Sequence, residues 1–172
     1  MKLYRARIPA IANNVISELV NGGDIEVEPE NQGEAELDLV SIMEEYLRRD
    51  FQLRERVKEQ MSIASVSYDQ YGKWRSRVAE EWNHPTGEAV GKFLARQFIE
   101  NFMISRFVEE VYTEDALLWR KTLDLLRSHD VDEGALRAEA IASIKNEREG
   151  TVDYEIAMQK AMREVKKRKG LI

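Results

Sequence analysis

The sequence predicts a mainly α-helical protein, a compact bundle of about seven helices with one short extended or β arm near residues 24–28. Apolar residues recur every three or four positions along most of the 172-residue chain, which is the spacing of amphipathic helices. Only 3 Pro and 9 Gly interrupt this spacing. A chain of this length can bury one ordinary core, so we expect a single helical domain over residues 1–172.

The first helix is expected to begin at Pro9, because proline suits the first turn of a helix, and to end at Gly22 and Gly23. Residues 24–28 then alternate acidic and β-branched side chains, which predicts a short strand or extended arm that Pro29 ends. No partner strand is evident in the sequence.

Asp38 is a candidate N-cap for a long second helix with one apolar stripe: Leu39, Ile42, Met43, Tyr46, Leu47, Leu53, Val57 and Met61. Ser67 and Gln70 have the spacing of a capping box and predict the start of a third helix, which ends in the loop 83–87. We expect the aromatic residues in and near this helix, together with one further tryptophan, to pack in the core: Tyr68, Tyr71, Trp74, Trp82 and Trp119.

Residues 88–112 form the most apolar segment, and we interpret it as a central helix because its apolar residues cover more than one face. Thr113 or Asp115 can cap the next helix, and residues 130–133 lead into another. Gly150 breaks the chain before a last helix that ends near Gly170.

A weak internal repeat relates residues 8–28 to residues 115–135. Residues 18–25 align without gaps on residues 124–131, each at the end of an apolar helix. Chance similarity among Leu, Val and Asp explains the match equally well, so the repeat does not bear on function.

Composition narrows the classes of function. The chain has no cysteine, which excludes disulfides, thiolate ligands and a cysteine nucleophile and fits a reducing compartment, so we expect a cytoplasmic protein. No segment approaches the roughly 20 apolar residues of a membrane span, and we expect no membrane partner. The net charge of −6 disfavours undirected binding to nucleic acid or anionic lipid.

The sequence offers one weak candidate for a metal site. Glu81 and His84 have the Glu-x-x-His spacing that places two ligands on one helix face in di-iron bundles. Such sites need a second motif, which the chain lacks, and His84 precedes Pro85 at a helix end. We therefore predict no metal, no cofactor and no catalytic residue.

The candidate residues for contacts with nucleic acid or a partner are the basic residues near the two ends of the chain: Arg5, Arg7, Lys166, Lys167, Arg168 and Lys169. Cations at the end of a helix also stabilise its dipole, so a purely structural role is the stronger interpretation. The nucleic-acid interpretation gains if the two ends of the chain lie together.

Residues 24–38 hold seven carboxylates and no basic residue. An extended acidic arm of this kind can pair with a basic partner or a sheet edge, although a solvated loop is the more common outcome.

Eight segments that follow one another in order along the chain carry a resemblance to a known family: 3–12, 23–28, 36–38, 45–48, 98–103, 108–110, 131–133 and 169–171. In these segments the chain resembles the uncharacterised bacterial proteins of domain of unknown function (DUF) family 507. The resemblance implies a bacterial cytosolic helical protein, and it brings no activity, ligand or catalytic residue.

The sequence favours a non-enzymatic interaction protein that acts as an adaptor, a subunit or a homo-oligomer, because its distinctive residues serve packing and charged surface. A nucleic-acid-associated regulator that uses the basic ends is the alternative. An enzyme with a metal held by Glu81, His84 and acids of the central helix ranks last.

Overall fold

The computed structural model describes residues 1–144 and 150–172, and within them it confirms the mainly α architecture. The helices are α1 (Ile8–Asn21), α2 (Gln32–Ile63), α3 (Tyr71–Glu81), α4 (Ala89–Ile104), α5 (Asp115–Ser128), α6 (Glu133–Ser143) and α7 (Val152–Arg168). Short 3-10 turns occupy Arg5–Arg7, Pro29–Asn31 and Tyr68–Gln70, and two strands, β1 (Ile25–Glu26) and β2 (Glu110–Val111), form an antiparallel pair.

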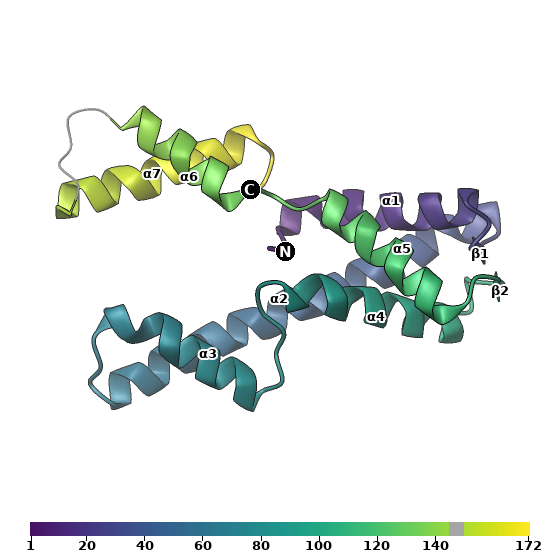
Figure 1. Ribbon diagram of the computed structural model, residues 1–172, viewed down its shortest axis with the longest axis horizontal. Helices are drawn as coiled ribbons and strands as arrows, with labels where there is room; N and C mark the ends of the chain where they lie inside the picture. The colour runs from purple at the N-terminus through teal and green to yellow at the C-terminus, as the bar shows by residue number, and fades with distance from the viewer. Residues whose placement is uncertain (145–149) are drawn as a thin grey trace.

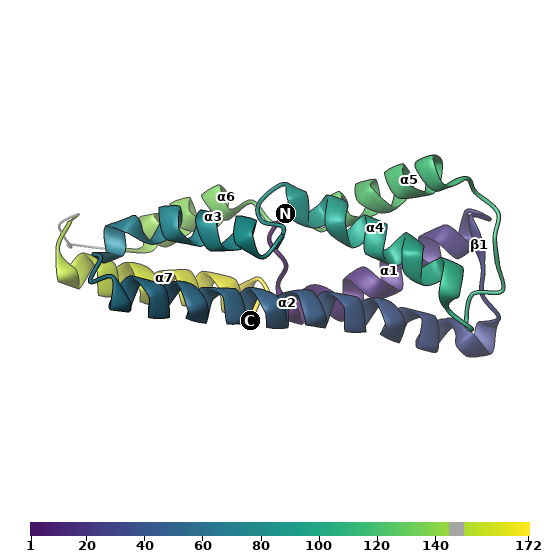
Figure 2. The same cartoon turned by 90° about the horizontal axis from the view of Figure 1, so that it is seen from below.

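The helices form a body with two arms (Figure 1). The body consists of α1, the first half of α2, α4 and α5. The first arm is the second half of α2 packed with α3, and the second arm is α6 packed with α7. Both arms extend from the same end of the body, opposite to β1 and β2 (Figure 1). Because α2 is 32 residues long, it spans about 48 Å and runs from the body into the first arm (Figure 2).

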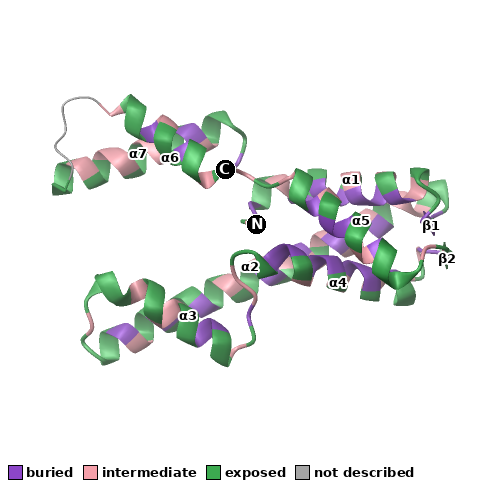
Figure 3. Ribbon diagram, viewed as in Figure 1, coloured by how far each residue is buried: buried purple, intermediate pink, exposed green. Residues whose placement is uncertain are grey.

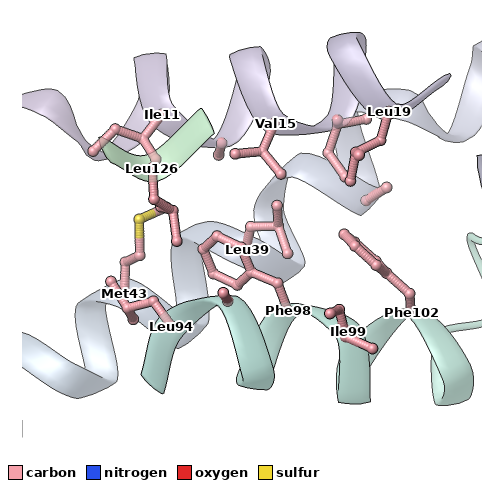
Figure 4. Close-up of a cluster of buried hydrophobic side chains, with 14 of the residues drawn as sticks. Ile11, Val15, Leu19, Leu39, Met43, Leu94, Phe98, Ile99, Phe102 and Leu126 are labelled. Atoms are coloured by element: carbon pink, nitrogen blue, oxygen red, sulfur yellow. The ribbon is translucent and has the colours of Figure 1, made fainter. Parts of the chain in front are cut away.

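The body contains the largest group of buried apolar side chains. Phe98 and Leu94 of α4 point toward Leu39 and Met43 of α2, while Ile11 and other residues of α1 cover the opposite side (Figure 4). Leu118 and Leu126 bring α5 into the same cluster. The fully buried members come from four helices and the strand β1, which are distant in the sequence, so the body is held by long-range packing.

Each arm has its own small apolar cluster, and exposed residues dominate both arms (Figure 3). The first arm buries Leu53, Val57, Met61, Val78 and Ala79. The second arm buries Leu136, Ala140 and Val165 against Tyr4 and Leu171, which come from the two ends of the chain. The apolar side chains therefore form three clusters within the helical architecture.

The extended arm expected at residues 24–28 is confirmed as β1, and its partner lies in an unexpected place. Ile25 pairs with Val111 and Glu26 pairs with Glu110. The prediction of a helix over residues 88–112 was wrong at its end, because α4 stops at Ile104 and the following residues turn to form β2.

Asp38 is also not the N-cap of α2, which begins six residues earlier at Gln32. Instead, the Asp38 carboxylate accepts a hydrogen bond of 2.7 Å from the hydroxyl of Ser105, just beyond α4. This bond ties the end of the central helix to α2 and helps to fix the point at which the chain turns toward β2.

The aromatic residues of the first arm are less buried than expected. Tyr71, Trp74 and Trp82 are half-buried against the arm cluster, and Tyr68 is 77% exposed. Trp119 is half-buried against the body. Ser67 does not cap α3 with its side chain.

The segments of the weak repeat share only part of their structure. Residues 18–25 and 124–131 each include the end of a helix, but Ile25 lies in a strand whereas Val131 lies in the link to α6. The single domain over residues 1–172 stays a prediction. Among the described residues, no helix combines the length and the apolar character needed to cross a membrane.

Candidate functional site

A cleft of about 830 Å³ lies where the two arms leave the body. Its lining includes Tyr46, Asp50, Arg54 and Arg75 on the side of the first arm. Lys2 and Glu133 line it on the side of the second arm. The cleft therefore brings together residues from both arms and from the start of the chain.

Asp50 is the centre of an ion network on the wall formed by the first arm. One of its carboxylate oxygens lies 3.1 Å from His84 Nε2 and 3.1 Å from an Arg75 guanidinium nitrogen, and the other lies 3.3 Å from Arg54 Nε. The Asp50 side chain is 14% exposed. Three partners thus compensate one largely buried carboxylate.

The position of Asp50 follows from the stripe of α2. Met43, Tyr46, Leu53 and Val57 are all buried, and Asp50 falls between them at the same helical spacing. An acid in an apolar stripe must be compensated, because a buried charge without a partner costs several kcal/mol, on the order of 3 to 5. Arg54 lies on α2 itself, whereas Arg75 comes from α3 and His84 from the loop that follows it, so the network joins the first arm to the body.

Tyr46 and His84 stack beside this network, with ring centroids 4.9 Å apart and planes 11° from parallel. The Tyr46 hydroxyl donates to the backbone oxygen of Pro85 at 3.0 Å. Burial raises the pKa of Tyr46 to about 12, with a further contribution from the Asp50 charge. Burial also lowers the pKa of His84, although the hydrogen bond with Asp50 opposes this effect.

A second polar group forms the opposite wall. The Tyr4 hydroxyl donates to Glu133, which lies 3.5 Å from Lys2 Nζ. The ammonium groups of Lys2 and Lys166 lie 5.3 Å and 5.6 Å from the centre of the Tyr4 ring. Burial and the Lys2 charge lower the pKa of Lys166. This cluster brings the basic segments near the two ends of the chain together.

The structure does not join Glu81 and His84 into a metal site. Glu81 is exposed at the end of α3 and lies 3.3 Å from Arg77, whereas His84 is buried against Asp50 and Tyr46. Among the residues that the structure describes, no three His, Cys, Asp or Glu side chains are placed to hold a metal ion.

The basic residues that the sequence proposed as contacts lie near the two ends of the chain, and most of them already contact an acidic or aromatic side chain of the protein. Arg5 lies 3.6 Å from Glu44, and Arg168 and Lys169 both pair with Glu139. Burial lowers the pKa of His129, and the charge of Arg7, which is half-buried, lowers it further. Lys166 lies over Tyr4, and Lys167 is exposed.

The acidic run 24–38 is part of the fold rather than a solvated loop. Its first residue, Asp24, is 3% exposed and accepts hydrogen bonds from Lys121 at 2.7 Å and from Thr113 at 2.6 Å. Burial alone would raise the pKa of Asp24, but these bonds outweigh burial and hold it below its usual value. The later acids lie in β1, the turn after it and the first turns of α2.

Sequence reasoning missed the residues that organise the cleft, namely Tyr4, Tyr46, Asp50, Arg75 and Glu133. For Asp50 a signal was present, because it interrupts the apolar stripe of α2 at a buried position. For Tyr4, Arg75 and Glu133 no local pattern exists, since their partners are distant in the sequence.

The charged groups of the cleft pair with one another. His84 contacts a carboxylate, and among the described residues no serine or threonine hydroxyl is bonded to its ring. A nucleophile next to a base is the usual arrangement for covalent catalysis. The arrangement is better suited to fixing the geometry of the two arms.

The sequence profile of a family described as "Protein of unknown function (DUF507)" matches residues 1–171. No curated protein matches the chain.

Proposed function

Because the chain belongs to the DUF507 family, whose description assigns no function, we propose from its structure that it is a non-enzymatic interaction protein that holds a protein partner between its two arms. The observation that carries this proposal is the cleft of about 830 Å³ at the point where the arms leave the body. Both arms contribute side chains to it, so a partner seated there would contact both.

Exposed apolar residues on both arms support the proposal. On the first arm, Phe51, Ile63 and Tyr68 are 57%, 78% and 77% exposed. On the second arm, Val152 and Ile156 are 72% and 60% exposed. Aromatic residues are enriched at surfaces that bind other proteins.

Nucleic-acid binding is the second candidate function, and one observation favours it. Lys2 and Lys166 lie over the same ring of Tyr4, so the basic segments near the two ends of the chain do lie together. The pairing of Arg168 and Lys169 with Glu139 reduces the positive charge that this surface can offer to phosphate groups.

Purification of the tagged protein from its own cells, with and without nuclease, tests the two functions. A photo-reactive amino acid at Glu88, which lines the cleft, should cross-link to a defined protein partner. The same amino acid at Arg120, an exposed position of α5 in the body, serves as the control.

Cross-linking from position 88 alone that survives nuclease supports a partner in the cleft. Equal cross-linking from both positions, or none, counts against it. Recovery that nuclease abolishes, with binding that weakens steeply as salt rises, supports the second candidate instead.

A further inference from the structure

A groove of about 730 Å³ follows α6 and α7 along the second arm, and it adjoins the cleft because Glu133 lines both. Any partner that enters the cleft can therefore continue along the second arm without leaving a concave surface. The chemistry of this groove indicates what kind of segment would do so.

The floor of the groove is apolar. Met158 and Met162 are one turn apart on the same face of α7, and Ile172, 59% exposed, joins them. Methionine side chains are flexible and polarisable, so they adapt to differently shaped apolar partners. A floor of this kind suits the apolar face of another helix.

Unpaired cations stand on both sides of this floor. Arg137 of α6 and Arg163 of α7 line the groove, and neither forms an ion pair with any residue in the described part of the chain. Lys166 lies at the end near the cleft. The acid in the lining, Glu133, is already bonded to Tyr4 and Lys2, so the free charge of the groove is positive.

The apolar surface extends toward the tip of the arm. Ile141 follows Arg137 by four residues on α6 and is 43% exposed, and Val152, 72% exposed, precedes the groove residue Gln159 by seven residues on α7. From Val152 to Lys166 this face of α7 is about 21 Å long, which matches roughly four turns of a partner helix.

We propose that this groove binds an acidic amphipathic helix of a protein partner, with the apolar face of that helix on Met158 and Met162 and its carboxylates against Arg137 and Arg163. The proposal rests on the proposed function and names the segment that the second arm holds. Charge complementarity selects an acidic helix, because the cations of the groove have no described acidic partner within the chain.

The protein's own acidic end lies far from this groove. Residues 18–38 carry eight acidic residues and no basic residue, and β1 within them is at the end of the body opposite to the arms (Figure 1). An acidic ligand of the second arm would therefore avoid the strongest repulsion from the protein itself.

Fluorescence anisotropy with a labelled synthetic helix of about 16 residues tests the proposal directly. The probe has leucines at helical spacing on one face and glutamates beside them, and two control peptides replace the glutamates by lysine or the leucines by serine. We expect the wild-type protein to bind the acidic leucine peptide and neither control, and to bind it less tightly as salt rises.

The double variant Arg137→Glu/Arg163→Glu should weaken binding of this peptide by about tenfold or more, and Met162→Asp should do the same. Lys160→Glu is the matched control, because Lys160 is exposed on the same helix two residues after Met158, away from the groove face. It should leave the affinity unchanged, and circular dichroism should show that all three variants keep their helix content.

Three results would overturn the inference: no binding of the acidic peptide, equal binding of the lysine peptide, or an equal loss in Lys160→Glu. Concentration-dependent self-association of the protein alone that Met162→Asp abolishes would also overturn it, since a second copy would then fill the groove. If the peptide fails but a partner still cross-links from position 88, this inference alone is wrong. If the peptide binds but no partner is found in cells, the proposed function fails instead.

Discussion

The body and the arms differ in how many apolar side chains hold them together. The body cluster contains 23 buried residues drawn from four helices, the strand β1 and the segments beside them, whereas the cluster of each arm contains five. Since local opening is cheapest where few apolar contacts must be broken, the arms can separate or reshape at a lower cost than the body. A rigid body with adaptable arms is well suited to binding a partner between the arms.

α4 and α7 show the contrast within single helices. α4 buries seven of its 16 residues, but α7 buries only Val165 among its 17. Isolated helices of this length are marginal in water, so α7 depends on its few contacts with α6, Tyr4 and Leu171. An additional apolar partner along α7 would therefore stabilise it considerably.

Truncating a buried side chain in the body and one in an arm should show the largest difference between the two regions. Phe98→Ala in the body should lower the free energy of unfolding of the whole protein by about 4 kcal/mol, because Phe98 is fully buried among helices distant in sequence. Leu136→Ala in the second arm should cost about 3 kcal/mol locally. Hydrogen exchange measured by mass spectrometry and urea unfolding together separate the two effects.

In Leu136→Ala, exchange should accelerate in α6 and α7 while α4 keeps its wild-type protection. In Phe98→Ala, protection should fall in α1, α2, α4 and α5 together. If Leu136→Ala reduced protection equally in α4, the arm and the body would form one cooperative unit, and the contrast between them would be wrong.

The same contrast explains which parts of the fold could be predicted from the sequence. Regular spacing over a whole helix predicted α1 and the alternation after it predicted β1. The end of α4 could not be predicted, because Phe107, Val108 and Val111 continue an apolar run that fits a helix equally well. Only pairing with Ile25, far away in the sequence, decides that this segment is extended.

The arrangement into arms also depends on long-range information. The stripe of α2 runs from Leu39 to Met61, and its first half packs in the body whereas its second half packs in the first arm. What divides the two halves is Asp50, the polar member of the stripe. The interruption of the stripe marks Asp50, but its partners on α3 and beyond are set by the tertiary fold and could not be predicted from the sequence.

Buried carboxylates provide a second comparison, with a smaller expected effect. Asp24 in the body has one cationic partner, Lys121, whereas Asp50 at the base of the first arm has Arg54, Arg75 and His84. Lys121→Met should lower the free energy of unfolding by about 2 kcal/mol, because it leaves a buried carboxylate with only a hydroxyl donor. Arg54→Met should cost about 0.5 kcal/mol or less, since two partners remain.

Chemical denaturation of both variants at neutral pH measures this difference, and Lys121→Arg is the control that keeps a cation in place. The pH dependence provides a further check. The wild-type pKa of Asp24 lies below the usual 3.8, so its contribution is present above that pH and is lost on acidification. If Lys121→Met and Arg54→Met lowered the free energy of unfolding equally, the number of cationic partners would not determine how much a buried carboxylate depends on each one.

The two histidines offer the smallest and most local test. Burial is the main cause that lowers the pKa of both, His84 at the first arm and His129 in the body. A histidine whose folded pKa lies below the unfolded value of 6.5 takes up its proton preferentially in the unfolded state. Its contribution to stability is therefore complete above pH 6.5 and decreases as the pH falls toward the folded pKa.

Lowering the pH from neutral to mildly acidic should consequently accelerate hydrogen exchange in α3, because protonation of His84 places a charge in a buried site beside Arg49 and Arg75. His84→Gln should remove this acceleration, corrected for the intrinsic pH dependence of exchange, whereas His129→Gln should preserve it. An unchanged response in His84→Gln would mean that other groups control the first arm. The expected response would instead identify the Asp50 network as the joint that fixes this arm to the body.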